Sequence, residues 1–200
     1  MGRRNDHSRE EIRELALAAT FEIVTEQGFH QLSVRKIASA IGYTVGSLYL
    51  IFKNLDDLIL QANVHNLEII YQILQQTEKK QKKPEQRLLA FAHAYLHFTI
   101  EQPYRWQMIF EHRMQNNEPV PEWFEPHVSR LFSLLEAPLA QLMADAEPEQ
   151  VRQTARAMWC AVHGVSTLYM TEKLEVVGSE SVQNLLDRLM GIFLEGVKTA

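Results

Sequence analysis

The sequence holds a single cysteine, Cys160, among its 200 residues. One thiol excludes a disulfide within the chain and suits a reducing cytoplasm. Long apolar runs are missing too, because no stretch approaches the roughly 18 apolar residues of a membrane span. The arginines near the N-terminus are followed by polar residues, unlike those of a signal peptide. The sequence therefore predicts a cytoplasmic protein with no membrane association.

Proline and glycine are scarce, with 7 and 8 residues respectively. Because these two residues interrupt helices, most of the chain can be helical. Apolar residues recur at helical spacing, whereas strand-like alternation persists nowhere. With 46 % hydrophobic residues, the chain can bury one sizeable core, or form a small domain joined to a larger one. The predicted fold class is all-α.

Catalytic signatures are also missing. The sequence has no phosphate-binding loop, no dinucleotide fingerprint and no Gly-x-Ser-x-Gly motif. His93 and His97 have a spacing compatible with metal binding, but the Glu of the zinc-hydrolase motif is absent and no cysteine pair lies nearby. We therefore expect no metal, no cofactor and no enzymatic activity. An enzyme is a minor alternative that would require a cleft with paired titratable groups.

The net charge of −5 argues against indiscriminate binding to nucleic acid. Residues 1–55 hold 7 Lys and Arg against 6 Asp and Glu, whereas residues 56–200 hold 13 against 19. A near-neutral segment can bind DNA when its cations share one face. DNA would repel the acidic remainder, so any DNA contact is expected in the first quarter of the chain.

The N-terminal region predicts a helix over about 8–27. Ser8 is a good N-cap, and Glu11, three residues later, completes a capping box. Gly28 suits the end of this helix because glycine accepts the left-handed conformations found there.

Two short helices joined by a tight turn follow. Ser33 begins the first, Gly42 closes it, and Thr44 caps the second. Short helices on either side of a glycine-containing turn form the helix-turn-helix pattern of DNA-binding proteins. An ordinary three-helix bundle shares this pattern, so the pattern alone leaves both possibilities open.

The rest of the sequence predicts helices at about 54–81, 84–102, 103–114, 121–145, 147–173 and 179–198. The first of these is roughly 40 Å long at 1.5 Å per residue, long enough to connect two domains. Pro138 is expected to kink or break the helix that contains it. We predict a helix-turn-helix domain over residues 1–53 and a ligand-binding and dimerisation domain over residues 54–200.

Residues 33–58 resemble the signature of the TetR family of transcription regulators. The shared positions, in continuous spacing, are Val34, Ile37, Ala38, Gly42, Thr44, Gly46, Leu48, Tyr49, Phe52 and Leu58. Gly28 at the end of the preceding helix also matches. The resemblance covers roughly a quarter of the chain, and the number and lengths of the later helices also suit the family.

The resemblance implies that the helix after Thr44 enters the major groove of double-stranded DNA. The Thr44 hydroxyl and the free N–H groups of the helix end can bind a phosphate, and Gly46 allows close approach of the backbone. Tyr43, in the turn, either reaches DNA or only packs. The residues expected to contact DNA are Arg35, Lys36, Tyr43, Thr44, Val45, Gly46, Ser47, Tyr49 and Lys53.

Two positions depart from the family pattern. Ile51 stands where members often carry His or Tyr, and Leu55 stands where they usually carry Lys. Two phosphate contacts are therefore missing, and Lys53 can replace one of them. Arg3 and Arg4 form either an arm that enters the minor groove or only a solubilising tail.

The C-terminal domains of the family diverge widely, but Trp159, His163 and Gly164 resemble the Trp-His-Gly motif of one subgroup. The resemblance implies a pocket for a small-molecule effector, and the aromatic side chains of the middle helices suit an apolar or aromatic ligand. For any single residue an ordinary core is the simpler explanation. The predicted ligand-binding residues are Tyr95, Phe98, Tyr104, Trp106, Phe110, Trp123, Phe124, Trp159 and His163.

One recognition helix covers few base pairs, so specific binding requires a two-fold dimer on a palindromic site. The resemblance assigns the dimer face to the last two helices, whose apolar residues include Val162, Val165, Leu168, Tyr169, Leu185, Leu189, Phe193 and Leu194. The predicted function is a homodimeric repressor released by a small ligand. The alternative is a DNA-bound scaffold that recruits a protein partner without a small molecule, which an exposed apolar patch would favour.

Overall fold

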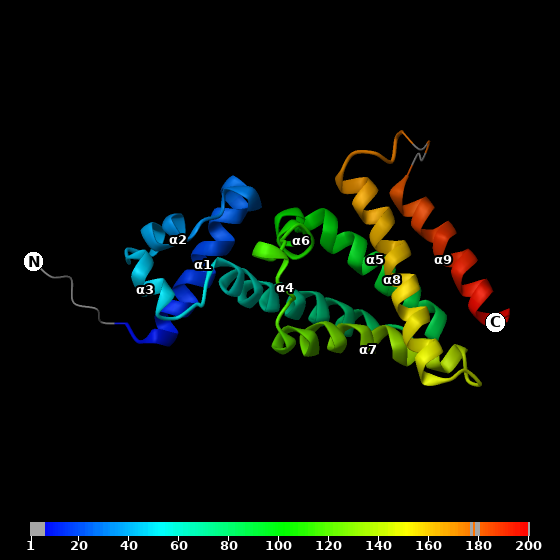
Figure 1. Ribbon diagram of the computed structural model, residues 1–200. Coiled ribbons are helices and arrows are strands. Elements are labelled where there is room, and N and C mark those ends of the chain that lie inside the picture. The colour runs from blue at the N-terminus through cyan, green and yellow to red at the C-terminus, as the bar shows by residue number, and fades with distance from the viewer. Residues whose placement is uncertain (1–6, 177, 179–180, 200) are drawn as a thin grey trace, which may run out of the picture. The chain divides into compact units, whose positions relative to one another are not determined.

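The computed structural model describes residues 7–176, 178 and 181–199. Within these ranges the chain is helical and contains no strand, which confirms the predicted all-α class (Figure 1). Packing divides it into two compact units: unit 1, residues 1–66 and 104–124, and unit 2, residues 67–103 and 125–200. The predicted functional division between residues 53 and 54 is a separate matter and stays a prediction.

Unit 1 contains the helix-turn-helix. Its elements are α1 (Arg9–Gln27), η1 (Phe29–Gln31), α2 (Val34–Ile41), α3 (Val45–Tyr49), the first part of α4 (Leu55–Glu78), α6 (Pro103–Phe110), η2 (Gln115–Asn117) and η3 (Glu122–Phe124). The helix ends follow the local chemistry of the sequence. Ser8, Ser33 and Thr44 each accept a hydrogen bond from the backbone N–H three residues later. The capping box of Ser8 and Glu11 is present, as predicted.

Several predicted helices are shorter than expected. The helix predicted from Thr44 to Phe52 ends at Tyr49, the long helix ends at Glu78 rather than 81, and the helix from Pro103 ends at Phe110 rather than 114. The helix predicted at 121–145 spans Glu125–Leu142, and that predicted at 147–173 spans Pro148–Met170. The residues that follow these helix ends form tight turns instead. At the end of α4, for example, the N–H of Gln81 donates to the carbonyl of Glu78 at 3.0 Å.

The core of unit 1 joins the helices of the helix-turn-helix to a residue far along the chain. Ile37 of α2, Leu48 of α3 and Leu58 of α4 are buried together with residues of α1. Met108 of α6 is completely buried in the same cluster. Helix α6 therefore packs as part of the unit that holds the helix-turn-helix.

Polar contacts also hold α6 in unit 1. The buried Asn63 side chain of α4 donates to the Met108 carbonyl at 2.9 Å, and Asn66 donates to Asn63 at 3.1 Å. Arg105 donates to the Asn66 side-chain oxygen at 2.8 Å, and its guanidinium lies 4.4 Å from the centre of the Phe21 ring. Because these amides are buried, each hydrogen bond matters to where α6 lies.

A second attachment follows α6. The Asp56 carboxylate, at the start of α4, lies 2.9 Å from His112 Nε2 and accepts the Gln115 backbone N–H at 3.0 Å. The Asp56 and His112 side chains are almost fully buried. The segment after α6 is thereby fixed to the first turn of α4.

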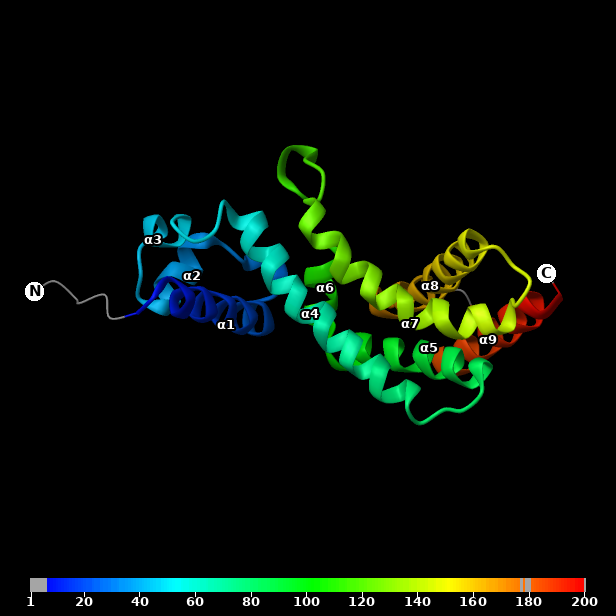
Figure 2. The ribbon, with the colours of Figure 1, turned by 90° about the horizontal axis from the view of Figure 1, so that it is seen from below.

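Unit 2 is a helical bundle. It contains the remainder of α4 with α5 (Pro84–Glu101), α7 (Glu125–Leu142), α8 (Pro148–Met170) and α9 (Val182–Thr199). Helix α8 packs against α5, α7 and α9, and α7 lies alongside it in Figure 2. Pro138 is buried inside α7, which continues through it, so the helix does not break there. A kink, the other predicted outcome, stays a prediction.

Over the described part of the chain, no helix is long and apolar enough to cross a membrane. The same residues contain no group of three His, Cys, Asp or Glu side chains arranged to hold a metal ion. In particular, His93 lies 2.6 Å from the Asp187 carboxylate of α9 and has a partner within the protein.

Candidate DNA interface and ligand site

The turn between α2 and α3 is set by Gly42. Its φ of 74° is a left-handed conformation that glycine adopts without steric cost. The next residue, Tyr43, donates its N–H to the Ala38 carbonyl at 2.9 Å. Thr44 then caps α3, accepting the Ser47 N–H at 3.1 Å. The cap hydroxyl also lies 2.9 Å from the Ser47 hydroxyl, so the two side chains are held together at the start of the helix.

The exposed face of α3 follows from what the helix buries. Leu48 and Phe52, four residues apart, are buried in the core. Tyr49 and Leu50 therefore point away from it and are 52 % and 72 % exposed. Leu50 was not among the predicted DNA contacts, although the spacing of its buried neighbours already placed it on the outer face. An exposed leucine beside a tyrosine suits apolar contact with base edges.

Glycine at position 46 has no explanation within the protein. A Cβ built there would meet only the Thr44 hydroxyl, at an ordinary 3.7 Å. The exposed position thus has room for a side chain, and close approach of another molecule is a reason for its absence.

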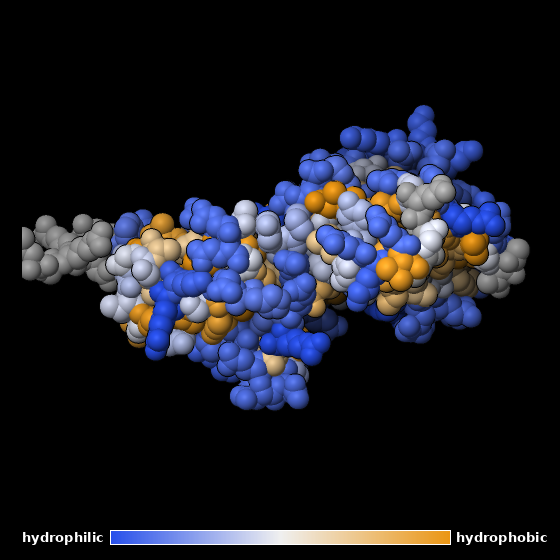
Figure 3. Space-filling view, turned by 90° about the horizontal axis from the view of Figure 1, so that it is seen from above, coloured by the Kyte–Doolittle hydropathy of each residue, from blue (hydrophilic) through white to orange (hydrophobic). Residues whose placement is uncertain are grey.

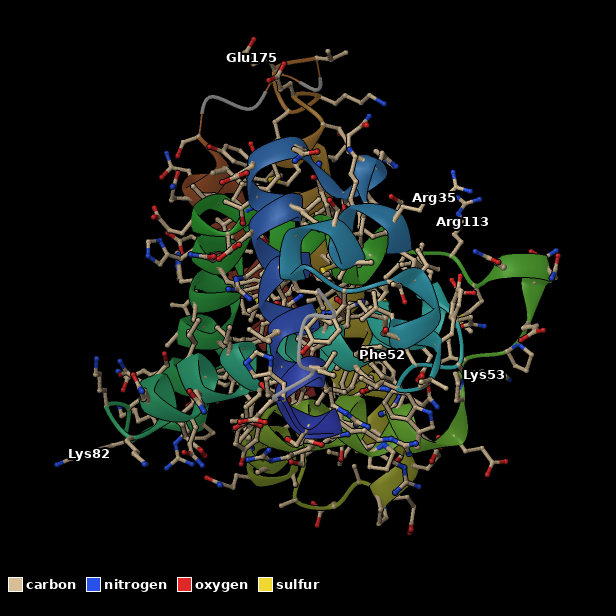
Figure 4. All side chains as sticks on the ribbon, turned by 90° about the vertical axis from the view of Figure 1, so that its left-hand side faces the viewer. Arg35, Phe52, Lys53, Lys82, Arg113 and Glu175 are labelled. Atoms are coloured by element: carbon tan, nitrogen blue, oxygen red, sulfur yellow. The ribbon has the colours of Figure 1, made fainter. Side chains whose placement is uncertain are left out.

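The predicted basic residues differ in their surroundings. Arg35 and Lys53 are exposed and extend outward, whereas Phe52 lies inside (Figure 4). The Lys36 ammonium instead donates to the Gln27 side chain at 2.8 Å. Arg3 and Arg4 lie outside the described residues. The DNA-contact assignments stay predictions, and Lys36 must exchange its glutamine partner to reach a phosphate.

The two departures from the family pattern have a structural role. Ile51 and Leu55 are partly buried and pack against the core of unit 1. Lys53 lies between them, and its backbone N–H donates to the Asp57 carboxylate at 2.8 Å. This hydrogen bond fixes the segment that carries the exposed lysine side chain.

The structure brings three predicted ligand residues together in unit 2. The Tyr95 hydroxyl lies 2.7 Å from His163 Nδ1, and the Trp159 ring stacks on the imidazole at 4.9 Å between centroids. Phe132 meets the Trp159 ring edge-on at 5.8 Å. Burial lowers the pKa of His163 below the usual histidine value, which favours a neutral imidazole within this aromatic cluster.

The other predicted ligand residues lie in both units. Phe98 is buried in unit 2. In unit 1, Trp106 is buried with Phe110 beside it at 5.3 Å, and Trp123 lies 5.9 Å from Phe124. Tyr104 and Trp123 are each 42 % exposed. The ligand assignments for these residues stay predictions.

Helix α8 has an outer face of small and apolar residues. The face consists of Ala157, Cys160, Ala161, Gly164 and Leu168, which share one side of the helix. Leu185, Leu189 and Ile192 form a corresponding stripe on α9, with Ile192 57 % exposed. Val162 and Val165, also suggested for dimer contacts, are instead buried in the protomer. Figure 3 shows hydrophobic side chains at the surface of the right-hand part, which holds unit 2.

Comparison with known proteins gives the family. The model described as "Bacterial regulatory proteins, tetR family" matches residues 16–62. The model described as "Tetracyclin repressor-like, C-terminal domain" matches residues 88–193, which is more than half of the chain. The Trp-His-Gly subgroup is not tested by these matches and stays a prediction.

Among curated proteins, the fatty acid metabolism regulator protein of Bacillus subtilis (strain 168) is 43 % identical over 42 residues. This match spans 21 % of the present chain and 22 % of that protein, so the chain matches about a fifth of the relative's length. Whatever that whole protein does is therefore not transferred by the match.

Solved structures share the fold over nearly the whole chain. A Rhodococcus sp. RHA1 protein of unknown function has a TM-score of 0.76 at 17 % identity, covering 98 % of both chains. The regulator FadR of Bacillus subtilis, in complex with stearoyl-CoA, has a TM-score of 0.71 at 16 % identity, covering 92 % of this chain and 98 % of that one. A TetR family regulator from Marinobacter aquaeolei VT8 has a TM-score of 0.66 at 18 % identity, covering 93 % and 95 %. With its helix-turn-helix and both family matches, the chain belongs to the TetR family of bacterial transcription regulators.

Proposed function

We propose that this regulator is a homodimeric repressor that binds a palindromic operator and is released by a small, largely apolar ligand bound in unit 2. The observation that carries the ligand part is the cluster of Tyr95, Trp159 and His163. It combines aromatic surfaces with a histidine whose pKa is lowered by burial. A neutral imidazole and a phenol suit an uncharged polar group on an otherwise apolar molecule.

A long-chain acyl thioester is the first ligand to test. Its acyl part has an extended apolar chain and an uncharged thioester carbonyl, which suit the aromatic surfaces and the His163–Tyr95 pair. The FadR structure of similar fold contains stearoyl-CoA, and the curated relative is named for fatty acid metabolism. These relatives supply a candidate ligand for the present chain.

The dimer face is proposed to consist of the outer sides of α8 and α9. A helix face turned to water normally carries charged or polar residues, whereas the α8 face carries none from Ala157 to Leu168. Small residues such as Gly164 and Ala161 allow helices to approach closely, and the leucines of α9 supply apolar area. A second copy of the chain, related by a two-fold axis, buries both faces.

Release requires that the ligand binds two states of the dimer with different affinity. In the operator-bound state, the two recognition helices are separated by about 34–36 Å, one turn of DNA. In the ligand-bound state, a shift of α4 changes that separation. A ligand that binds both states equally tightly would not release the protein from its operator.

The experiment begins with an operator selected from random duplexes by the purified protein. Operator affinity is then measured with and without stearoyl-CoA, for the wild type and for Tyr95→Phe. We expect the thioester to lower wild-type affinity at least tenfold and to affect the variant less, because the phenol that holds His163 is gone. Tyr71→Phe is the control, since that ring lies under Arg130 at 3.7 Å, and it should respond as the wild type does.

Unchanged operator affinity at saturating thioester, with binding of the thioester verified directly, would contradict release by this ligand. An equal response in Tyr95→Phe and the wild type would place the ligand elsewhere.

One observation favours the scaffold alternative. A groove of about 590 Å³ lies between α4 and α5, lined by apolar parts of Ile73, Leu89, Ala90 and Ala94 among others. A protein partner docking there would bind the operator-bound dimer without a small molecule. Substitution of Ala94 by Arg would weaken such a partner and leave operator affinity unchanged.

A further inference from the structure

A contact in unit 1 joins residues far apart in the sequence. His7 Nδ1 lies 2.8 Å from the Tyr43 hydroxyl, and the two ring centroids are 6.2 Å apart. His7 immediately precedes the Ser8 cap of α1, and Tyr43 immediately precedes the Thr44 cap of α3. The imidazole is therefore held beside the start of the recognition helix, although no sequence pattern placed it there.

Packing fixes one partner of this pair and leaves the other exposed. The Tyr43 ring is half-buried against the core of unit 1, so its hydroxyl has a defined position at the edge of the core. His7 is exposed. The hydroxyl therefore holds a histidine that is open to solvent at the proposed DNA surface.

The charged group facing His7 within α1 is Glu11. Its carboxylate accepts the Ser8 N–H at 2.6 Å, and this backbone hydrogen bond is the main cause of its lowered pKa. Charge on His7 lowers the Glu11 pKa further by a small amount. From the α2–α3 turn, the titratable group facing His7 is the Tyr43 phenol. Glu10 also lies in the first turn of α1.

The two protonation states of the imidazole offer DNA different groups. In imidazolium, Nδ1–H donates to the Tyr43 oxygen, which leaves the phenolic O–H and Nε2–H as two donors for a phosphate. In neutral imidazole with Nδ1 as acceptor, the phenolic proton is used within the pair and only Nε2–H is left to donate. In the other neutral tautomer, Nε2 is an acceptor and only the phenolic O–H is left to donate, so each neutral form offers one donor and no positive charge.

We propose that the His7–Tyr43 pair is a proton-dependent phosphate-binding site of the DNA interface, and that operator binding takes up one proton at each His7. This site rests on the proposed DNA interface around Thr44 and adds to it a residue and a pH dependence. Histidine is the side chain that commonly changes charge between pH 5 and 8, so pH is the variable that tests the site.

The direction of the pH effect on operator affinity follows from the number of hydrogen-bond donors that the pair offers to a phosphate. The protonated pair binds phosphate better, so operator affinity rises as pH falls. An exposed ionic contact is worth roughly a factor of three, and two half-sites together give about tenfold between pH 8 and pH 6.

The test measures operator affinity of the full-length protein at pH 6, 7 and 8, over a salt series at each pH. The wild type is compared with His7→Gln, with Tyr43→Phe and with the control His30→Gln. Gln keeps a polar side chain that cannot become charged. His30 is a suitable control because it is an exposed histidine of the same unit whose partner is Glu111, at 3.1 Å.

We expect His7→Gln to lose most of the tenfold change and to bind as the wild type does at pH 8. At pH 6 its salt dependence should fall by about one phosphate contact per protomer. Tyr43→Phe should lose part of the change because His7 is no longer held, and His30→Gln should keep all of it.

A pH dependence in His7→Gln equal to that of the wild type would overturn the site while leaving operator binding intact. An equal loss in His30→Gln would overturn it too, because general protein charge would then explain the effect. Failure of the wild type to bind any selected duplex at all three pH values would instead overturn the proposed function itself.

Discussion

Substitution of Gly164, on the outer face of α8, tests whether this face is a dimer interface or a solvent-exposed surface. The two possibilities predict opposite effects of Gly164→Ala on stability and dimerisation. A Cβ added at this position meets nothing within 4 Å in the protomer. Gly164→Ala therefore causes no clash within one chain. What the added methyl meets depends only on whether a second chain covers this face.

The free-energy effect of Gly164→Ala differs in sign and size between a solvent-exposed face and a dimer interface. Alanine is about 1 kcal/mol more favourable than glycine inside a helix, so a solvated Gly164→Ala stabilises the protomer by roughly that amount. In a close helix–helix interface, two added methyls must be accommodated across the two-fold axis. Overpacking of this kind costs roughly 1–3 kcal/mol, which weakens dimerisation by about 5- to 150-fold.

The assay follows the dimer dissociation constant by sedimentation on dilution, together with the free energy of unfolding in urea. Gly191→Ala on α9 is the matched control. A Cβ there also meets nothing within 4 Å, but Gly191 shares its face with Asn184, Arg188 and Glu195 rather than with the leucine stripe. We expect a weaker dimer for Gly164→Ala and an unchanged dimer for Gly191→Ala.

The reasoning is refuted if both variants are more stable and both dimerise as the wild type does. The α8 face would then be exposed to solvent in the dimer, and its lack of charge would need another explanation. Equal weakening by both variants would also refute it, because the polar face of α9 would then belong to the interface.

Three further substitutions or conditions test other parts of the molecule. Thr44→Ala removes the cap of α3 and should destabilise unit 1 by about 1 kcal/mol, measured by urea titration. It should also weaken operator binding, measured by a binding titration. Unchanged stability would show that another group caps the helix. His112→Ala leaves the buried Asp56 carboxylate without its histidine partner and should lower the free energy of unfolding by about 2 kcal/mol, the cost of an unsatisfied buried acceptor. A loss below about 0.5 kcal/mol would contradict the importance of this contact. The pKa of His163 is lowered in the folded state, so the unfolded chain binds more protons at this residue. The contribution of His163 to stability is therefore complete above the ordinary histidine pKa of about 6.5 and is lost as pH falls below it. Unfolding measured over a pH series should show this loss in the wild type and not in His163→Gln.

Local chemistry explains which features the sequence predicted well. The caps at Ser8, Ser33 and Thr44 were correct because each depends on a side chain and a backbone group three residues apart. Gly42 was correct for the same reason, since its left-handed φ is a property of one residue. Helix ends that depend on later packing, such as that of α4 at Glu78, were predicted less accurately.

Contacts between distant residues explain what the sequence could not predict. No sequence pattern predicted that Met108 of α6 belongs to the core of the helix-turn-helix. The grouping of Tyr95, Trp159 and His163 has the same origin, because the sequence does not show which of its aromatic residues are neighbours.

The placement of α6 gives the sequence departures at Ile51 and Leu55 a consistent explanation. Both side chains pack against the same core that contains Met108. Replacing either with the His, Tyr or Lys of the family pattern would put a polar group at that surface, at the expense of apolar contact. The chain thus has more apolar packing where relatives have phosphate contacts. DNA affinity must then come from groups outside that position, of which Lys53 and the His7–Tyr43 pair are available in unit 1.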